Sequence, residues 1–274
     1  MALFTVDPKK CQRDGLCVAV CPGLLIEIVS EEGFPTPIAD AETLCINCGH
    51  CVSVCPHGAL SLKSITPKDC LPVKKELALS PAQGEQFLKS RRSIRSYKEK
   101  PVPRDLLARI IEFASYAPTG GNTQPVRWLV IEDTKEVRRL TGLVTDWQRT
   151  QIQAEADEFL RARLERLVTA WDQGIDRICR NAPHLIIAHG LSSLPATQSS
   201  CIIALTYLEL AALSLGLGTC WAGYFNTAAN SYPPLLEALD LPRDHLPFGA
   251  MMIGYPKYQY QRIPLRNKPK ITWH

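Results

Sequence analysis

A cysteine-rich segment near the start of the chain constrains its fold more than any other feature. Seven of the eleven cysteines fall between positions 11 and 55. The segment Cys11–Pro22 (CQRDGLCVAVCP) matches Cys45–Pro56 (CINCGHCVSVCP) when the two are offset by 34 positions. A repeat of this kind indicates two copies of one supersecondary unit.

The second copy has the spacing C-x2-C-x2-C-x3-C-P, which is typical of iron–sulfur ligation. Three thiolates, each separated from the next by two residues, can reach one cluster, whereas the fourth, on the helix that follows, points toward another cluster. Gly15 and Gly49 let the ligand loops bend tightly. A single C-x-x-C would also allow zinc, but two offset copies that each end in Cys-Pro favour iron–sulfur clusters.

Over about Leu3 to Ile65, the chain resembles bacterial two-cluster ferredoxins. The resemblance implies a βαββαβ-like domain with two [4Fe–4S] clusters, one of them held by Cys21, Cys45, Cys48 and Cys51. It implies that the other is held by Cys11, Cys17 and Cys55, with Asp14 at the position of the family's eighth cysteine. A carboxylate oxygen can ligate iron, so Asp14 is expected to be a weak fourth ligand. The alternatives there are a solvent ligand or a three-iron cluster.

The pattern after this domain changes to mixed helix and strand. We expect a first domain over 1–65, a linker rich in proline and lysine over 66–84, and a second domain over 85–274. Cys70, in the linker, is interpreted as an ordinary cysteine. Apolar periodicity in the second domain predicts helices over 104–117, 151–171 and 201–217, and strands over 126–131, 185–188 and 248–253. This pattern indicates a sheet covered by helices.

Composition excludes several other classes of protein. The net charge of +4 is too small to indicate a nucleic-acid partner. The N-terminus lacks the apolar core of a signal peptide, so a cytoplasmic protein is expected. The longest apolar stretch, 201–218, contains Thr206, Glu209 and Ser214, and therefore predicts a buried helix and no membrane span.

Four segments of the second domain have the composition of a phosphate and flavin site. Arginines and a serine in one extended segment suit an anion, although such runs are often solvated surface. Asparagine and glutamine in a turn carry the donors and acceptors that a flavin's pyrimidine edge requires, and glycines permit close approach to a planar ligand. The candidate residues are Arg91, Arg92, Ser93, Arg95; Pro118, Thr119, Gly120, Asn122, Gln124; Cys220, Trp221, Gly223; and Arg262, Arg266.

Together these segments (RRSIRSY, APTGGNTQP, GLGTCWAG and P-x-R) resemble the FMN-dependent nitroreductase family from about Gln86 onward. The resemblance implies an α+β homodimer with FMN at the subunit interface. It implies that residues 91–95 and Arg266, with Arg262, hold the phosphate, that Asn122 and Gln124 approach the ring, and that 220–223 lies near N5. Residues 142–180 are expected to form a lid or a dimer-wrapping segment.

This combination predicts an FMN-dependent oxidoreductase whose clusters feed electrons to the flavin, which then reduces a nitroaromatic, quinone or activated alkene. The alternatives are an electron-transfer or redox-sensing module acting on a protein partner, and a dehalogenase-type relative. The donor is an external ferredoxin or NAD(P)H, since no dinucleotide-binding motif is evident. No catalytic residue is assigned, because His184 and His189 flank an apolar run and are expected in the core or at its edge.

Overall fold

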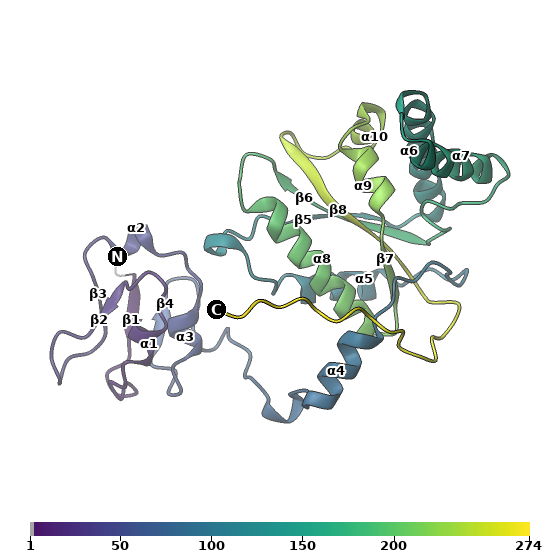
Figure 1. Cartoon of the computed structure of the whole chain (residues 1–274). Helices are drawn as coiled ribbons and strands as arrows, with labels where there is room; N and C mark the ends of the chain where they lie inside the picture. Colours follow the sequence, from purple (N-terminus) through teal and green to yellow (C-terminus); the bar gives the residue numbers. More distant parts are fainter. Residues whose placement is uncertain (1–2) are drawn as a thin grey trace. The chain divides into compact units, whose positions relative to one another are not determined.

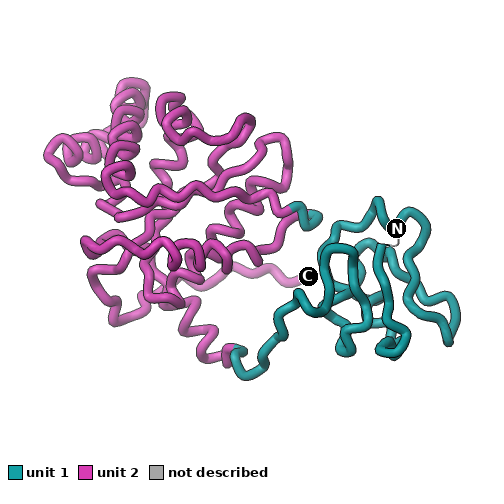
Figure 2. Tube along the Cα trace, turned by 180° about the vertical axis from the view of Figure 1, so that it is seen from behind, with its two compact units in different colours: residues 1–78, 121–123 teal, residues 79–120, 124–274 magenta. Residues whose placement is uncertain are grey.

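The computed structural model describes residues 3–274, which form two compact units (Figure 2). Unit 1 comprises Met1–Ala78 with Gly121–Thr123, and unit 2 comprises Leu79–Gly120 with Gln124–His274. Met1 and Ala2, at the start of the predicted first domain, lie outside the described residues. No helix within residues 3–274 is long and apolar enough to cross a membrane.

Unit 1 is built from short elements around a small apolar core (Figure 1). Two antiparallel pairs form its sheets: β1 (Phe4–Val6) with β4 (Leu60–Leu62), and β2 (Ile26–Glu27) with β3 (Thr36–Pro37). The first and last strands of this unit are therefore neighbours in one sheet. Its single-turn helices are α1 (Leu16–Ala19), α2 (Ala41–Leu44) and α3 (His50–Ser53), and the 3₁₀ turn η1 (Lys75–Leu77) follows in the linker.

The backbone of unit 1 repeats with the same 34-residue offset as the cysteines. Three matched pairs adopt the left-handed conformation, with φ of 57° and 50°, 71° and 75°, and 53° and 56° at Arg13/Asn47, Gly15/Gly49 and Leu24/Gly58. Gly15 and Gly49 immediately precede α1 and α3, so each begins the helix that carries a ligand cysteine. The two copies therefore share backbone conformation as well as ligand spacing.

Replacing Leu24 with glycine is expected to raise the free energy of unfolding by about 0.5–1 kcal/mol. Leu24 is 74% exposed, so little packing is lost, and its partner in the repeat is already Gly58. Urea unfolding of the cluster-loaded protein measures the change. Exposed Leu44, whose φ is not positive, provides a control, since Leu44→Gly is expected to destabilise α2. An equal loss in both variants would contradict the prediction.

Unit 2 contains a four-stranded antiparallel sheet in the order β5-β6-β8-β7. The strands are β5 (Arg127–Ile131), β6 (His184–Leu191), β7 (Gly218–Trp221) and β8 (His245–Gly254). The strands expected over 126–131, 185–188 and 248–253 correspond to β5, β6 and β8. The sequence does not predict β7, because glycines at 216, 218 and 223 indicate a loop rather than a strand.

Helices cover both faces of this sheet, so the central strands are buried on each side. One layer contains α5 (Arg104–Ala114) and α8 (Thr197–Ser214), which pack on Ile186 and Met251. The opposite layer contains α6 (Thr134–Ala154), α9 (Gly223–Ala229) and α10 (Pro233–Ala238), which pack on Leu185, Ile187 and Met252. Alternate residues of the central strands β6 and β8 therefore pack into the cores on opposite faces of the sheet. This burial on both faces explains why these strands are continuous apolar runs in the sequence.

The helix expected over 151–171 is wrong as a single element. The chain forms α6, which ends at Ala154, and α7 (Glu158–Asp172), with an extended residue at Glu155. The Asp157 side chain accepts a hydrogen bond from the Leu160 backbone N–H (3.0 Å) and so begins a new helix. The remaining helices are α4 (Pro81–Ser90) and the 3₁₀ turn η2 (Gly120–Asn122).

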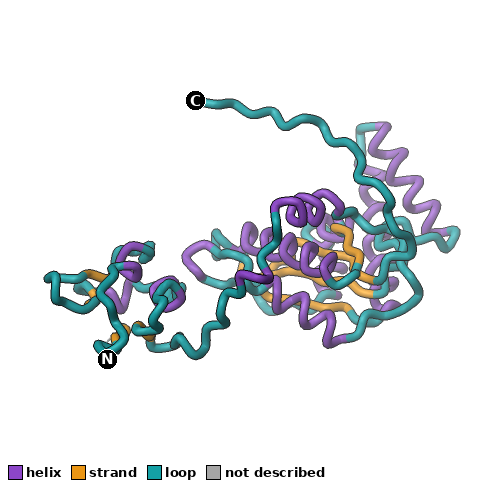
Figure 3. The backbone as a smooth tube through the Cα atoms, turned by 90° about the horizontal axis from the view of Figure 1, so that it is seen from below, coloured by secondary structure: helices purple, strands orange, loops and turns teal. Residues whose placement is uncertain are grey.

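The C-terminal segment carries two of the expected phosphate ligands. Tyr97 and Pro256 form an isolated bridge, beyond which the chain contains no helix or strand to His274 (Figure 3). Leu265 is fully exposed and Trp273 is 85% exposed. Within the described residues of this chain, the segment therefore contributes little to the core.

Candidate functional site

Four cysteines from both copies of the repeat line one cavity in unit 1, which we call the cysteine cavity: Cys21, Cys45, Cys48 and Cys51. Apolar side chains of β1, β2 and β4 close it, including Phe4, Ile26 and Leu62. The pKa of the Cys51 thiol is raised to about 11, first by burial and then by Cys48, with a smaller contribution from Cys21. These are the four ligands predicted for one cluster, and their convergence fits such a group.

Three members of the other predicted ligand set interact electrostatically. Burial raises the pKa of the Cys17 thiol, and the charges of Cys11 and Asp14 raise it further. Asp14 Oδ1 accepts a hydrogen bond from the Leu16 backbone N–H (3.2 Å). This contact leaves Oδ2 of the carboxylate available to a metal.

Matched backbone groups donate to the last cysteine of each copy. Leu25 N–H donates to Cys21 Sγ, and Ala59 N–H donates to Cys55 Sγ, both at 3.3 Å. Such bonds stabilise a thiolate and influence the potential of the cluster it ligates. The two copies therefore match in their ligand environment too.

The arginine-rich segment 91–95 runs along the edge of the sheet in unit 2. Ile94 N–H donates to the Thr219 carbonyl of β7 (2.8 Å). A Cβ at Gly218 would lie 2.7 Å from Ile94, so this glycine permits the packing of 91–95 on β7. At Gly223, in contrast, a Cβ would meet nothing within 4 Å, so this backbone faces open space, as close approach of a ligand requires.

Two arginines of this segment differ in how they are paired. Arg91 forms an ion pair with Glu209 of α8, with Nη1 to Oε1 at 2.9 Å. The Nε of Arg92 is buried and has no hydrogen-bond partner among residues 3–274. A buried, unpartnered donor in a run expected to bind phosphate fits an anionic cofactor group.

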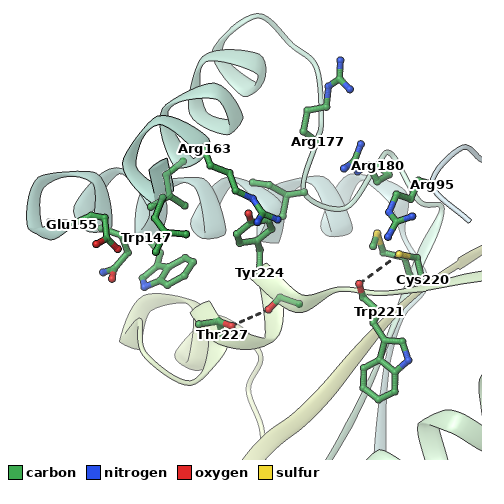
Figure 4. A pocket seen from close by; sticks show the side chains of 16 residues that line it. Arg95, Trp147, Glu155, Arg163, Arg177, Arg180, Cys220, Trp221, Tyr224 and Thr227 are labelled. Atoms are coloured by element: carbon green, nitrogen blue, oxygen red, sulfur yellow. Dashed lines mark hydrogen bonds between the residues drawn. The ribbon is translucent and has the colours of Figure 1, made fainter. Parts of the chain in front are cut away.

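A cavity of about 560 Å³ opens beside the C-terminal end of β7 (Figure 4), and we call it the arginine cavity. Of the predicted flavin residues, it brings together Arg95, Cys220, Trp221 and Gly223. Its volume lies in the range of ligand sites. The segment expected to form a lid, 142–180, supplies much of the wall through α6 and α7, including Trp147.

Cys220 is a neutral thiol in this environment. Burial raises its pKa, an effect that Arg95 and Arg180 partly oppose. Its Sγ–H donates to the Trp221 carbonyl at 3.6 Å, a contact drawn in Figure 4. The side chain is therefore placed to shape the cavity, and its thiol remains protonated near neutral pH.

The other predicted flavin residues lie elsewhere. Thr119 and Gln124 line a separate cavity of about 300 Å³. The Gln124 N–H donates to Thr119 Oγ1 (3.1 Å). Asn122 and Gln124 both adopt positive φ, which a turn at this point requires. The others, all exposed and outside the arginine cavity, are Pro118, Gly120, Arg262 and Arg266.

Sequence reasoning missed four charged residues. Arg163, Arg177 and Arg180 line the arginine cavity, and Glu209 pairs with Arg91. No short motif marks the three arginines, because they come from α7 and from the loop before β6. The presence of Glu209 inside an apolar helix was the available signal, since a buried carboxylate needs a partner.

The two histidines beside the apolar run are buried, as expected. His184 Nε2 accepts from the Val102 N–H (2.7 Å), and its Nδ1 contacts the Glu132 carbonyl (2.8 Å). His189 Nδ1 lies 2.9 Å from His245 Nδ1. The pKa of His189 is lowered to about 4, first by burial and then by His245 and Arg127.

Acid is expected to destabilise unit 2 through His189. Its pKa is below the ordinary value in the folded chain, so the unfolded chain binds the extra proton first. The contribution of neutral His189 to the free energy of unfolding is complete above about pH 6.5, and it is lost as the pH falls toward 4. The loss should exceed about 1.4 kcal/mol, the equivalent of one unit of pKa.

Urea unfolding between about pH 7 and pH 4.5 measures this loss, with His189→Gln as the comparison. The variant should show a shallower decline of the free energy of unfolding with pH. Parallel declines in the two proteins would contradict the assignment to His189.

Comparison with known proteins identifies both parts of the chain. The model of the nitroreductase family matches residues 88–255, more than half of the chain. The chain belongs to the nitroreductase family. The 4Fe-4S dicluster domain matches residues 9–60, so an iron–sulfur domain precedes the nitroreductase domain. The expected α+β fold with an N-terminal ferredoxin-like domain is confirmed.

Several nitroreductase-family proteins are similar to the second part. FMN reductase [NAD(P)H] of Bacillus subtilis is 32% identical, over 65% of this chain and 67% of that protein. The 5,6-dimethylbenzimidazole synthase of Rhodospirillum rubrum is 27% identical, over 67% of this chain and 85% of that protein. The FMN-bound nitroreductase of Bacteroides fragilis shares the fold, with a TM-score of 0.56 and 22% identity, over 69% of this chain and 98% of that one.

Proposed function

We propose that this nitroreductase-family protein is an FMN-dependent oxidoreductase whose iron–sulfur clusters deliver electrons to the flavin for reduction of a small acceptor. One observation carries the proposal: a single chain contains both the cysteine cavity and the arginine cavity. The clusters would supply single electrons, and FMN would store one or two electrons and pass them to the acceptor.

The residues of the chain have distinct roles in this proposal. Arg92 and Arg95 hold the anionic part of FMN, together with Ser93, and the Gly223 backbone permits close approach of the ring. Trp147 and Tyr224 form the apolar and aromatic wall, which excludes water and stacks on planar molecules. The predicted roles of Asn122, Gln124, Arg262 and Arg266 belong to the same proposal.

The proposed cofactor ligation in unit 1 uses the cysteine cavity for one cluster and Cys11, Cys17 and Cys55 with Asp14 for the other. Cys21, with the three cysteines of the second run, holds one [4Fe–4S] cluster. Asp14 is the fourth ligand of the other, where the charge of its carboxylate is close to Cys17. A carboxylate binds iron less tightly than a thiolate, so this cluster should lose one iron more readily.

We propose that the functional protein is a homodimer of this chain. α8 is apolar on its exposed side as well as toward the core, with Ile202, Ile203 and Tyr207 about 40% exposed. Continuous apolar surface of this kind indicates a protein interface.

Ile203→Lys is expected to weaken the homodimer at least about tenfold, because it places a charge in the interface core. Sedimentation equilibrium of the cofactor-loaded protein measures the dissociation constant. Thr206→Lys, one turn further along α8, tests whether the exposed face as a whole is covered. A monomeric parent protein would overturn the homodimer and leave the redox proposal standing.

Anaerobic stopped-flow reduction tests the proposed order of electron transfer, from the clusters to the flavin and then to the acceptor. The flavin and cluster absorbance are followed after mixing with reduced ferredoxin, NADH or NADPH, and then with a nitroaromatic, a quinone or an activated alkene. Cluster reduction that precedes flavin reduction and acceptor turnover supports the proposal. Flavin reduction by NAD(P)H while the clusters stay oxidised would overturn it.

Two alternatives give other outcomes in the same experiment. A protein that reduces no small acceptor but rapidly reduces a protein partner is an electron-transfer module. The dehalogenase alternative is supported by the 24% identity of this chain to iodotyrosine deiodinase of Nematostella vectensis. Turnover of a halogenated tyrosine in the same experiment tests it.

A further inference from the structure

The arginine cavity contains more positive charge than a single FMN phosphate requires. Arg163, Arg177 and Arg180 line it beyond Arg95, and the same three arginines also line an adjoining cavity of about 620 Å³. Arg166 adds a further guanidinium to that second cavity. The two cavities therefore share one cationic wall.

Acidic side chains leave this wall largely uncompensated. Within residues 3–274, Glu155 is the single acidic side chain lining the arginine cavity. Across the same residues, no ion pair within 4.0 Å involves Arg163, Arg177 or Arg180. Like charges held together without counter-ions favour an anionic ligand.

The nearest acid in sequence, Asp176, is already bonded to the backbone. Its Oδ1 accepts from the N–H groups of Ile178 and Cys179, both at 2.8 Å, and its Oδ2 accepts from Asn181 at 2.9 Å. Asp176 therefore shapes the loop that presents Arg177 and Arg180. The pKa of Arg180 is lowered, first by burial and then by the charges of Arg95 and Arg177, so the positive charges of these three residues oppose one another.

Arg163 is positioned by an aromatic ring. Its guanidinium carbon lies 5.5 Å from the centre of the Tyr224 ring, a favourable cation–π distance. Figure 4 shows the Arg163 side chain extending from α7 toward Tyr224, with Arg177 and Arg180 beside the same cavity. A planar molecule lying against Tyr224 would thus present a substituent to the arginines.

We propose that Arg163 and Arg177, with Arg180, form an anion subsite that binds a carboxylate or phosphate group of the acceptor reduced at the flavin site. The proposal rests on the proposed function and names its substrate class. The acceptor is a planar, reducible small molecule with at least one negative charge away from the group that is reduced. Guanidinium groups bind both carboxylate and phosphate through paired hydrogen bonds.

Two nitro compounds that differ in one charge test this subsite. Calorimetric titration of the oxidised, flavin-loaded protein compares 4-nitrobenzoate with 4-nitrobenzyl alcohol. The carboxylate is expected to bind at least about tenfold more tightly, since hydrogen bonds between charged groups contribute more than neutral ones. Steady-state turnover should show the same preference in KM and a smaller difference in kcat.

Arg163→Gln/Arg177→Gln is expected to abolish the preference, by weakening 4-nitrobenzoate binding about tenfold or more and leaving the alcohol unchanged. Arg243→Gln is the control, because Arg243 is highly exposed at the surface and lines neither cavity. The control should bind both compounds as the parent does.

Three outcomes would overturn the subsite. Equal binding of the two compounds by the parent protein would show no charge recognition. A loss of bound flavin in the double variant would assign the arginines to the cofactor, and a rise in KM for NADPH alone would assign them to the donor. If neither compound is turned over, the proposed function fails, while the calorimetric charge preference still decides the subsite.

Discussion

Replacing Cys21 with alanine is expected to remove the cluster bound by the second cysteine run, although Cys21 belongs to the first. The reason is that Cys21 lines the cysteine cavity together with Cys45, Cys48 and Cys51. Loss of one thiolate from four leaves that cluster incomplete, so the iron content should fall by about half. Iron and sulfide analysis, with EPR of the reduced protein, measures the change.

Two further variants identify which cluster remains. Cys70→Ala should leave the iron content unchanged, because Cys70 packs at the edge of the core of unit 1 and is outside both predicted ligand sets. In the Cys21→Ala protein, Asp14→Cys should alter the EPR signal of the surviving cluster and slow its loss of iron. An unaltered signal would contradict Asp14 as a ligand, and full iron content in Cys21→Ala would contradict the exchange of Cys21 between the copies.

Arg91→Met is expected to lower the free energy of unfolding by about 3–5 kcal/mol. The substitution leaves the Glu209 carboxylate, only 7% exposed, without the guanidinium that now lies 2.9 Å away. A buried charge without a partner costs far more than an apolar side chain of similar size. Urea unfolding of flavin-depleted protein isolates this effect from any loss of bound cofactor.

The pair should behave asymmetrically. Glu209→Gln is expected to lower the free energy of unfolding less than Arg91→Met does. The Arg91 side chain is 25% exposed, so its charge can reach water when Glu209 is replaced. Arg91→Met/Glu209→Leu should recover most of the stability. Arg104→Met, which removes an 86% exposed partner of Glu132, should change stability by at most about 1 kcal/mol. Equal costs for Arg91→Met and Arg104→Met would refute the buried-pair interpretation.

The cluster domain could be predicted from sequence because its information is local. Successive predicted ligand cysteines within each copy lie three to six positions apart, and their grouping follows from the short loops and helices between them. The left-handed conformation also repeats with the cysteines, but position 24 is a leucine where the second copy has Gly58. Leucine at this point gives no signal of positive φ.

The nitroreductase domain could be predicted only in part, because segments far apart in the sequence form the arginine cavity. Arg95 and Gly223 belong to recognisable motifs, whereas Arg163 and Arg177 come from a region with no motif at all. Arg91 and Glu209 are 118 positions apart, so their pairing is invisible in the local pattern. The break between α6 and α7 did have a local signal, the Asp157 cap, but the apolar period alone obscured it.

In the proposed ligation, Cys21 from the first half of unit 1 binds the cluster of the second half, and Cys55 binds the cluster of the first. Neither half would then be a self-sufficient module, because each cluster takes a thiolate from the other half. Iron loading would therefore cross-link the two halves, in addition to the packing of the small apolar core that they share. Folding and metallation of this part of the chain should accordingly be one cooperative event, and a fragment cut in the 30–40 loop should retain neither cluster.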